Sequence, residues 1–222
     1  VMTVDNPKKK NILIVHNYYQ IPGGEDTVVA NEKKMLEKHG HKVILYSRNN
    51  AELKQMSKIQ KAFLPITTVF NPRTYRDIKK LIDEEKIEVV HVHNTLNLVS
   101  PAVYYAARRM KVPVVQTIHN FRLLCPGATF YRDGHICEDC VEYGLKCAVK
   151  HSCYRGSKIQ TLACVLSTAF HRMTGIYGKI NYICLTDFNK QKLLGLKQIK
   201  PERVFVKPNF CLLYTSPSPR DA

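Results

Sequence analysis

Short apolar runs alternate with longer amphipathic stretches along most of the chain. The first run, residues 11–16, holds four consecutive large apolar residues, as expected of a strand that is covered on both faces. A loop with two glycines follows, and then apolar residues at helical spacing as far as Gly40, a residue type that commonly ends helices. Strand, glycine loop and helix therefore succeed one another at the start of the chain.

The same alternation continues to residue 207. It predicts strands at residues 11–16, 42–46, 87–92, 113–118, 182–185 and 203–207. It predicts helices at residues 25–39, 72–85, 100–110, 157–177 and 187–196. Strands that alternate with helices favour a parallel sheet with helices on both faces, so residues 11–207 are expected to form one α/β, Rossmann-like domain.

Three segments fall outside this alternation. Residues 1–10 are interpreted as a basic N-terminal arm, and residues 121–156 as an irregular insertion rich in Cys, Gly and charge. Residues 211–222 carry no periodicity and begin abruptly after a predicted strand. We interpret these last residues as a tail foreign to the fold, so the parent gene is expected to be longer than this chain.

The composition is that of a folded, basic protein. Hydrophobic residues make up 45% of the 222 positions, which excludes disordered and collagen-like chains, and the formal net charge is +16. The sequence shows neither a run of about 18 apolar residues nor a signal-peptide pattern, so we expect a cytoplasmic protein without a transmembrane helix. Residues 146–207 hold 12 Lys and Arg against two carboxylates, which predicts an anionic neighbour: nucleic acid, anionic lipid or a sugar nucleotide.

Residues that suggest chemistry follow three of the predicted strands. They are Gly23 and Gly24 after the first strand, His91, His93 and Asn94 around the end of the third, and His119 after the fourth. Because the carboxyl ends of parallel strands share an edge, where open α/β sheets bind ligands, these residues are expected to meet in one crevice.

Gly23 and Gly24 stand between a strand and a helix whose first amides favour an anion. Two residues without side chains would let a phosphate approach the backbone. The pattern is neither GxGxxG nor the phosphate-binding loop that ends in Gly-Lys-Ser/Thr, and a tight turn without a ligand is the alternative. Glu25 and Asp26 could equally serve as first-turn carboxylates that complement the helix dipole.

His91 and His93 share one face of a strand, as the histidine ligands of metal hydrolases do. Such hydrolases resemble closed barrels of about 250 residues, whereas this chain predicts about six strands and shows no evident lysine or aspartate partners. The favoured alternative is that one histidine packs in the core and the other lines the crevice with Asn94.

The insertion carries four closely spaced cysteines, Cys137, Cys140, Cys147 and Cys153, with Cys125 shortly before them. Four thiolates within 17 residues suit a structural zinc ion, with Cys125 as a substitute ligand. Free thiols are the main alternative, and a redox-active dithiol is the third. Cys164 and Cys184 lie in an apolar helix and strand and are expected in the core.

Taken in order, the motifs resemble the N-terminal domain of the family 4 glycosyltransferases, retaining sugar-nucleotide enzymes with two Rossmann-like domains in the GT-B fold. The resemblance spans residues 11–210. It rests on His-Asn-Tyr-Tyr at 16–19, Gly-Gly-Glu-Asp at 23–26, His-Val-His-Asn at 91–94, Thr-Ile-His-Asn-Phe-Arg-Leu-Leu-Cys-Pro at 117–126, Cys-Tyr-Arg-Gly-Ser at 153–157 and Lys-Pro-Asn-Phe at 207–210. The last segment resembles the family's interdomain hinge, so residues 208–222 are expected to hold the start of that hinge and the foreign tail.

The resemblance implies transfer of a sugar from a nucleoside-diphosphate sugar to an acceptor hydroxyl, in polysaccharide or glycolipid synthesis, without a catalytic cofactor. By position it assigns His119 to the transfer centre, Gly23 and Gly24 to the donor diphosphate, and Glu25, Asp26 and Asn94 to the acceptor side. The family's second domain, which supplies most nucleotide contacts, is absent from this chain. We therefore expect the chain alone to be inactive or nearly so.

The basic residues 146–207 fit an enzyme that works at the anionic inner membrane face on a lipid-linked acceptor. The alternative is a solvated surface that balances acidic residues of the absent domain. Two other function classes are a nucleic-acid-binding module with a zinc loop and a metal-dependent hydrolase that uses His91 and His93. The resemblance favours a sugar nucleotide and a saccharide or lipid-linked acceptor as partners, and no nucleic acid.

Overall fold

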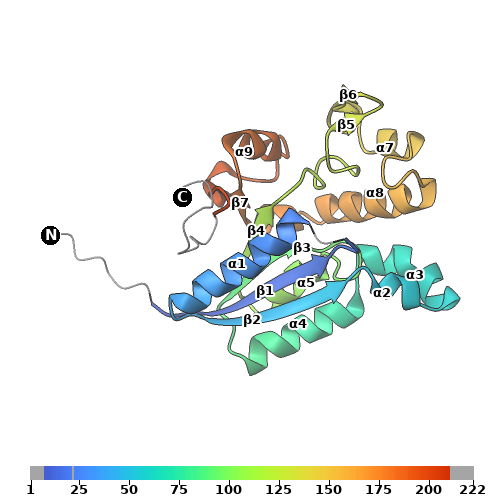
Figure 1. Ribbon diagram of the computed structural model, residues 1–222. Coiled ribbons are helices and arrows are strands. Elements are labelled where there is room, and N and C mark those ends of the chain that lie inside the picture. The colour runs from blue at the N-terminus through green and yellow to red at the C-terminus, as the bar shows by residue number, and fades with distance from the viewer. Residues whose placement is uncertain (1–7, 22, 211–222) are drawn as a thin grey trace, which may run out of the picture.

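Six parallel strands form the central sheet of the chain, in the order β2-β1-β3-β4-β7-β8 (Figure 1). The computed structural model describes residues 8–21 and 23–210. The strands are β1 Asn11–Tyr18, β2 Lys42–Asn49, β3 Val89–Asn94, β4 Val114–Ile118, β7 Asn181–Cys184 and β8 Val204–Val206. Each corresponds to a predicted strand, so the predicted α/β, Rossmann-like class is confirmed.

Helices cover both faces of this sheet, as predicted (Figure 1). The longer ones are α1 Gly24–Lys38, α3 Lys58–Val69, α4 Pro72–Glu84, α5 Ala102–Arg109, α8 Lys158–Met173 and α9 Asp187–Leu194. Ile12 and Ile14 of β1 pack with Val29 of α1 on one face. Leu13 and Val15 belong to the main core on the other face, together with residues of α4 and α5, because successive strand side chains point to opposite faces.

The order of the strands reverses direction at β1. Chain order runs outward from β1 to β2, returns to β3 on the other side of β1, and then proceeds to β8. In open α/β sheets a crevice forms at such a reversal, beyond the carboxyl ends of the two strands concerned. The topology therefore directs attention to the ends of β1 and β3.

Helix α3 and the short helix α2, Glu52–Gln55, were absent from the sequence prediction, which left residues 47–71 unassigned. Large apolar residues of α3 point to solvent, and Pro65 lies inside the helix, so the usual signature of a helix with a buried apolar face is missing. A local signal was nevertheless present. Ser57 and Gln60 form a capping box at the start of α3.

The helix predicted at residues 157–177 ends earlier than expected, at Met173. Gly175 adopts a left-handed backbone conformation with φ of 67°, which breaks the helix, and the 3₁₀ turn Ile176–Lys179 follows. This break lets the chain turn into β7.

The insertion at residues 121–156 joins β4 to α8 and is more ordered than predicted. It contains the hairpin strands β5 Tyr131–Arg132 and β6 His135–Ile136, and the short helices α6 Asp139–Glu142 and α7 Lys146–Lys150. Lys10, the last residue of the predicted basic arm, pairs with Glu88 at 2.6 Å. The predicted tail at 211–222 lies outside the described residues.

Candidate active site

A histidine of β3 and a histidine that directly follows β4 meet at the carboxyl edge of the sheet. Nδ1 of His93 in β3 lies 3.0 Å from Nε2 of His119, which follows β4, and the two rings stack with centroids 5.3 Å apart. A pocket beside them is lined by residues from β3, the end of β4 and α8, among them Asn94, Thr117, Asn120, Arg122, Ser167 and Thr168. The predicted convergence of the third and fourth strands on one crevice therefore occurs.

His119 is a neutral imidazole at neutral pH. Burial, followed by the charge of His16, lowers the pKa of His119 from 6.5 to about 4. A neutral imidazole carries one N–H donor and one acceptor nitrogen. The contact with His93 uses one of these, which leaves the other nitrogen of His119 for a partner in the pocket.

Asn17 and Asn94 connect β1 to the loop that follows β3. Asn94 Nδ2 donates to the Asn17 carbonyl at 2.9 Å, and Asn94 Oδ1 accepts the Leu96 N–H at 3.1 Å. Asn17 Oδ1 accepts the N–H groups of Leu98 and Val99 at 2.9 and 3.3 Å. Asn94 lines the pocket as predicted, but its side chain already holds the loop in place.

The glycine loop has no internal need for glycine. Gly23 caps α1 with φ of −127°, and Gly24 is absent from the residues with positive φ. A Cβ atom added at either glycine would meet nothing within 4 Å. The space beside the first turn of α1 is therefore open, and the donor role of the two glycines stays a prediction beside the alternative of a tight turn.

Glu25 and Asp26 have different surroundings. Asp26 accepts the Gly23 N–H at 2.9 Å and lies 2.7 Å from Nε2 of the buried His16, so both of its oxygens are engaged within the protein. Glu25 Oε1 accepts from the Tyr19 hydroxyl and from Asn120 Nδ2, each at 3.1 Å. Oε2 of Glu25 is buried without a hydrogen-bond partner, and burial raises the pKa of this carboxyl group.

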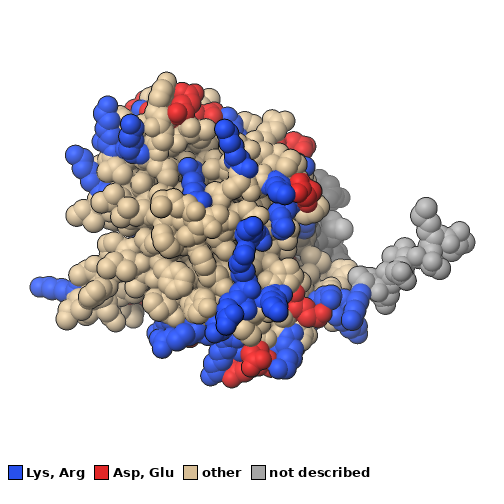
Figure 2. Space-filling model, turned by 180° about the vertical axis from the view of Figure 1, so that it is seen from behind, with Lys and Arg blue, Asp and Glu red and all other residues tan. Residues whose placement is uncertain are grey.

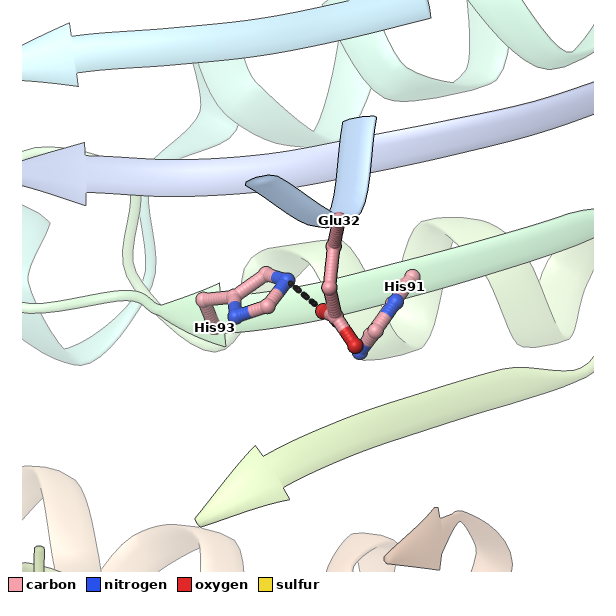
Figure 3. Close-up of side chains that lie close together, drawn as sticks. All are labelled: Glu32, His91 and His93. Atoms are coloured by element: carbon pink, nitrogen blue, oxygen red, sulfur yellow. Dashed lines mark ion pairs between the residues drawn. The ribbon is translucent and has the colours of Figure 1, made fainter. Parts of the chain in front are cut away.

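Glu32 is the residue of this region that the sequence interpretation missed. It reaches from α1 towards His91 and His93 of β3 (Figure 3), with Oε2 at 3.1 Å from His93 Nε2 and 3.8 Å from His91 Nε2. Lys207 Nζ lies 2.7 Å from the other carboxylate oxygen. A signal was available, because Glu32 occupies the helix face of Val29 and Leu36, where a charged residue is unexpected.

The charges around Glu32 compensate one another. Burial would raise the pKa of Glu32, but the contact with His93, the positive charge that His91 and His93 carry once protonated, and the hydrogen bond from Lys207 outweigh it and lower this pKa to about 2. Burial also lowers the pKa of His91 to about 3, and it lowers the pKa of His93. The arrangement is a lysine–carboxylate pair beside two neutral imidazoles.

Glu32, His91 and His93 are the one group among residues 8–21 and 23–210 whose ligand atoms lie close enough together to hold a metal ion. Two of these ligands already have protein partners. His91 Nε2 is 2.8 Å from Thr117 Oγ1, and Lys207 occupies one side of the carboxylate. His93 lines the pocket with Asn94 whereas His91 does not, which agrees with the favoured packing alternative.

The predicted cysteine ligands are near one another without forming a closed set. Burial, then the charges of Cys125, Cys153 and Cys147, raises the pKa of the Cys140 thiol to about 12. Among the described residues, no three of these sulfur atoms meet the spacing that Glu32, His91 and His93 satisfy. Zinc in the insertion remains a prediction, while Cys164 and Cys184 are buried as expected.

Basic side chains are widely distributed over the molecule. Seen from behind, Lys and Arg side chains are scattered over a mostly uncharged surface, and carboxylates are fewer (Figure 2). Within the basic residues 146–207, Lys192 pairs with Glu138 at 2.5 Å and Lys207 with Glu32. In the part of the chain that the structure describes, no helix has the length and apolar character needed to cross a bilayer.

Comparison with known proteins gives one family match and three individual similarities. The sequence model of Glycosyltransferase Family 4 matches residues 22–135, just over half of the chain. An uncharacterized 42.6 kDa protein in a cps region of Klebsiella pneumoniae is 27% identical over 120 residues, which cover 50% of this chain and 32% of that protein.

Two solved structures are similar in fold. An S. aureus MnaA-UDP co-structure aligns over 90% of this chain and 44% of its own, with a TM-score of 0.49 and 15% identity. UDP-GlcNAc 2-epimerase from Methanocaldococcus jannaschii aligns over 88% of this chain and 45% of its own, with a TM-score of 0.45 and 17% identity. The chain thus matches about a third of the curated relative and less than half of each solved chain.

Proposed function

The chain belongs to glycosyltransferase family 4, and from that premise we propose that it is the N-terminal, acceptor-side half of a retaining glycosyltransferase. The whole enzyme would move a hexose from a nucleoside-diphosphate sugar to an acceptor hydroxyl and keep the anomeric configuration. The relative from a cps, or polysaccharide, region supports a role in the synthesis of cell-surface polysaccharide or glycolipid. Neither nucleic-acid binding nor metal-dependent hydrolysis is needed to explain the family match.

The contact between His93 and His119 is the observation that carries this proposal. It fixes the ring of His119 at the edge of the sheet with one nitrogen already bonded. In the proposed reaction His119 places its other nitrogen against the donor sugar at the transfer centre. A hydrogen bond prearranged in a water-poor site stabilises developing charge without the cost of reorienting solvent.

The glycine loop is proposed to hold the donor diphosphate. Backbone N–H groups at the first turn of α1 and the helix dipole favour a phosphate oxygen. The empty space where Cβ atoms of Gly23 and Gly24 would stand supports this role, since nothing in the protein fills it. The fit concerns the substrate diphosphate and requires no resident cofactor.

The three residues assigned to the acceptor side divide into two kinds. Glu25 has an unbonded carboxylate oxygen and a raised pKa, so it is proposed to contact the acceptor hydroxyl directly. Asp26 and Asn94 are held by His16 and Asn17. These two are proposed to position the loops around the acceptor.

Substitution of His119 tests the function in a protein extended to the natural end of its reading frame. With a panel of sugar nucleotides and saccharide or polyprenyl-phosphate acceptors, His119→Ala is expected to lower kcat about 100-fold, as loss of one prearranged polar contact does. NMR of the product should show the anomeric configuration of the donor. His151→Ala, at an exposed position in the chain, is the matched control. Full transfer by His119→Ala, or an inverted product, would contradict the proposal.

Gly24→Ala separates donor binding from folding. Since the added methyl group meets nothing in the protein, the variant should fold with unchanged or slightly greater stability, by up to about 1 kcal/mol from helix propensity. In the extended enzyme, KM for the sugar nucleotide should rise while KM for the acceptor stays the same. An unchanged donor KM would remove the glycine loop from the proposed donor site.

A further inference from the structure

Helix α8 has the reverse of the usual amphipathic pattern. Its buried positions hold small or polar residues, among them Thr161, Cys164, Ser167, Thr168 and His171. Its exposed positions hold a stripe of large apolar residues at intervals of three and four, Ile159, Leu162, Leu166, Phe170 and Met173. A helix bathed in water on this side is expected to carry polar residues there. The exposed fractions of 73% at Ile159 and 84% at Met173 show that the described chain leaves this stripe uncovered.

Helix α3 packs beside α8 and repeats the same feature. Ser167 donates to the Thr68 carbonyl at 3.4 Å, and His171 Nε2 contacts the Val69 carbonyl at 2.8 Å, so polar residues join the two helices. The large apolar residues Ile59, Phe63 and Ile66 of α3 are exposed by 72, 57 and 64%. These three residues and the five of the α8 stripe are named the α3–α8 face. Figure 1 shows the two helices next to each other at one end of the sheet.

Positive charge accompanies this face. Residues 53–76 and 143–186 contain no Asp or Glu, so neither helix carries a carboxylate. Lys54, Lys61 and Arg155 line a pocket of about 400 Å³ between the helices, together with Leu64 and Ile159. In Figure 2, α3 and α8 lie in the left part of the molecule. There the surface shows Lys and Arg side chains among uncharged residues, and carboxylates appear only at the upper edge.

We propose that the α3–α8 face docks on an anionic membrane surface. Large apolar side chains enter the boundary between headgroups and acyl chains, while lysine and arginine side chains contact the headgroup phosphates. Charge selects this occupant, because an apolar surface on two helices that carry cations and no carboxylate complements an anionic lipid layer. An exposed apolar patch of this size on the surface of a folded protein commonly marks a binding surface.

The position of α8 connects this surface to the cleft. Cys164, Ser167 and Thr168, on the inner side of α8, line the pocket that also holds His93 and His119. One helix therefore separates the membrane-facing stripe from the proposed transfer centre. This step rests on the proposed function: a lipid-linked acceptor bound at the membrane would meet the cleft across the width of one helix.

Vesicle co-sedimentation of this chain tests the docking surface. We expect binding to vesicles of phosphatidylcholine with phosphatidylglycerol and little binding to phosphatidylcholine alone, at about 0.1 M salt. The triple variant Phe63→Ser, Leu166→Ser, Met173→Ser should lower the partition coefficient more than about tenfold. Its control is Ile136→Ser, since Ile136 is 76% exposed on the β5–β6 hairpin and is not part of the α3–α8 face, and circular dichroism verifies the fold of each variant.

A charge variant tests the cationic part. Lys54→Gln, Lys61→Gln, Arg155→Gln should lower partitioning about 100-fold, from about 1 kcal/mol per basic residue near an anionic surface. Lys34→Gln, Lys38→Gln, Lys80→Gln makes the same change in net charge on α1 and α4 and should bind as the unchanged protein does.

Three outcomes would overturn the proposal. They are absence of vesicle binding, equal binding by the variants and controls, and loss of binding when the extended protein replaces this chain, since the added domain would then cover the face. Concentration-dependent dimerisation that the apolar variant abolishes, without vesicle binding, would assign the face to a second copy. Transfer to a soluble saccharide by the extended enzyme distinguishes failure of docking from failure of the proposed function.

Discussion

At the scale of single residues, burial controls the protonation of the site. His91 and His93 lie on β3 beside Glu32, and Lys207 reaches the same carboxylate. A buried carboxylate without a cation would be costly, so Lys207 explains how Glu32 stays ionised inside the fold. The imidazoles remain neutral and available as hydrogen-bonding groups, which suits a site that positions a substrate.

The buried histidines should make the free energy of unfolding decrease as pH falls. Burial and the charge of His93 lower the pKa of His91 from 6.5 to about 3, so the unfolded chain takes up this proton at a higher pH than the folded one. Stability contributed by the neutral form is complete above about pH 6.5 and falls as pH drops towards 3, by about 1.4 kcal/mol per pH unit. His91→Gln should flatten the dependence of unfolding free energy on pH, measured in urea from about pH 7 to pH 4.

His151→Gln is the control for this measurement, because His151 is exposed and should leave the slope unchanged. A slope that is the same for His91→Gln and the unchanged protein would show that folding does not lower the pKa of His91. If His91→Gln fails to fold, NMR titration of the His91 ring in the unchanged protein provides the same information.

At the scale of elements, helix ends depend on side chains that also connect distant loops. Asn71 caps α4 by accepting the Arg73 N–H at 3.0 Å, and its Nδ2 donates to the Leu98 carbonyl at 2.6 Å. Ser100 Oγ accepts the Asn71 N–H at 2.8 Å. The start of α4 is thereby attached to the loop between β3 and α5, close to the pocket.

Loss of the Asn71 side chain should therefore lower the free energy of unfolding by more than the loss of an isolated helix cap does. Asn71→Ala is expected to lower the free energy of unfolding by about 2 kcal/mol, and Asn71→Asp by less, because aspartate keeps the capping acceptor and loses only the donor. Urea unfolding measures both values. Equal losses would mean that the contact with Leu98, and not the cap, supplies the stability.

Whether the cysteine-containing insertion at residues 121–156 binds zinc is a question for experiment. If the predicted zinc binds there, the chain should contain about one equivalent of metal by elemental analysis. Cys137→Ser, Cys140→Ser should remove it. Metal that survives this double substitution and disappears in His93→Ala would instead belong to the group of Glu32, His91 and His93.

At the scale of the whole molecule, the proposed function treats the described chain as one wall of a site. Its pocket is formed by the ends of β3 and β4 and by α8. Under the proposed function, a second domain of the whole enzyme would supply the opposite side of this site. In transfer chemistry, alignment of donor and acceptor in a closed site supplies much of the rate.

The chain alone should consequently show no measurable sugar transfer, whereas the extended protein should turn over. Incubation of each with the same panel of labelled sugar nucleotides and acceptors compares them directly. Transfer by the 222-residue chain at a rate near that of the extended protein would show that this half contains the complete site.

The sequence by itself determined the strands, most of the helices and the α/β class. Each of these depends on residues close together in the chain, as in the apolar run of β1 and the Gly40 that follows α1. It also brought His93, His119 and the glycine loop to one edge, because parallel strands share their carboxyl ends. The family resemblance then agreed with the match over residues 22–135.

Only the tertiary structure decided the contacts between distant residues. Glu32 and Lys207 are 175 positions apart, and no local pattern pairs them. The outward stripes of α3 and α8 likewise became visible only when their buried sides were known, since periodicity reveals an apolar face without saying whether protein or solvent lies against it. Side chains meet because the sheet order places their strands and helices side by side, and that order is a property of the folded chain.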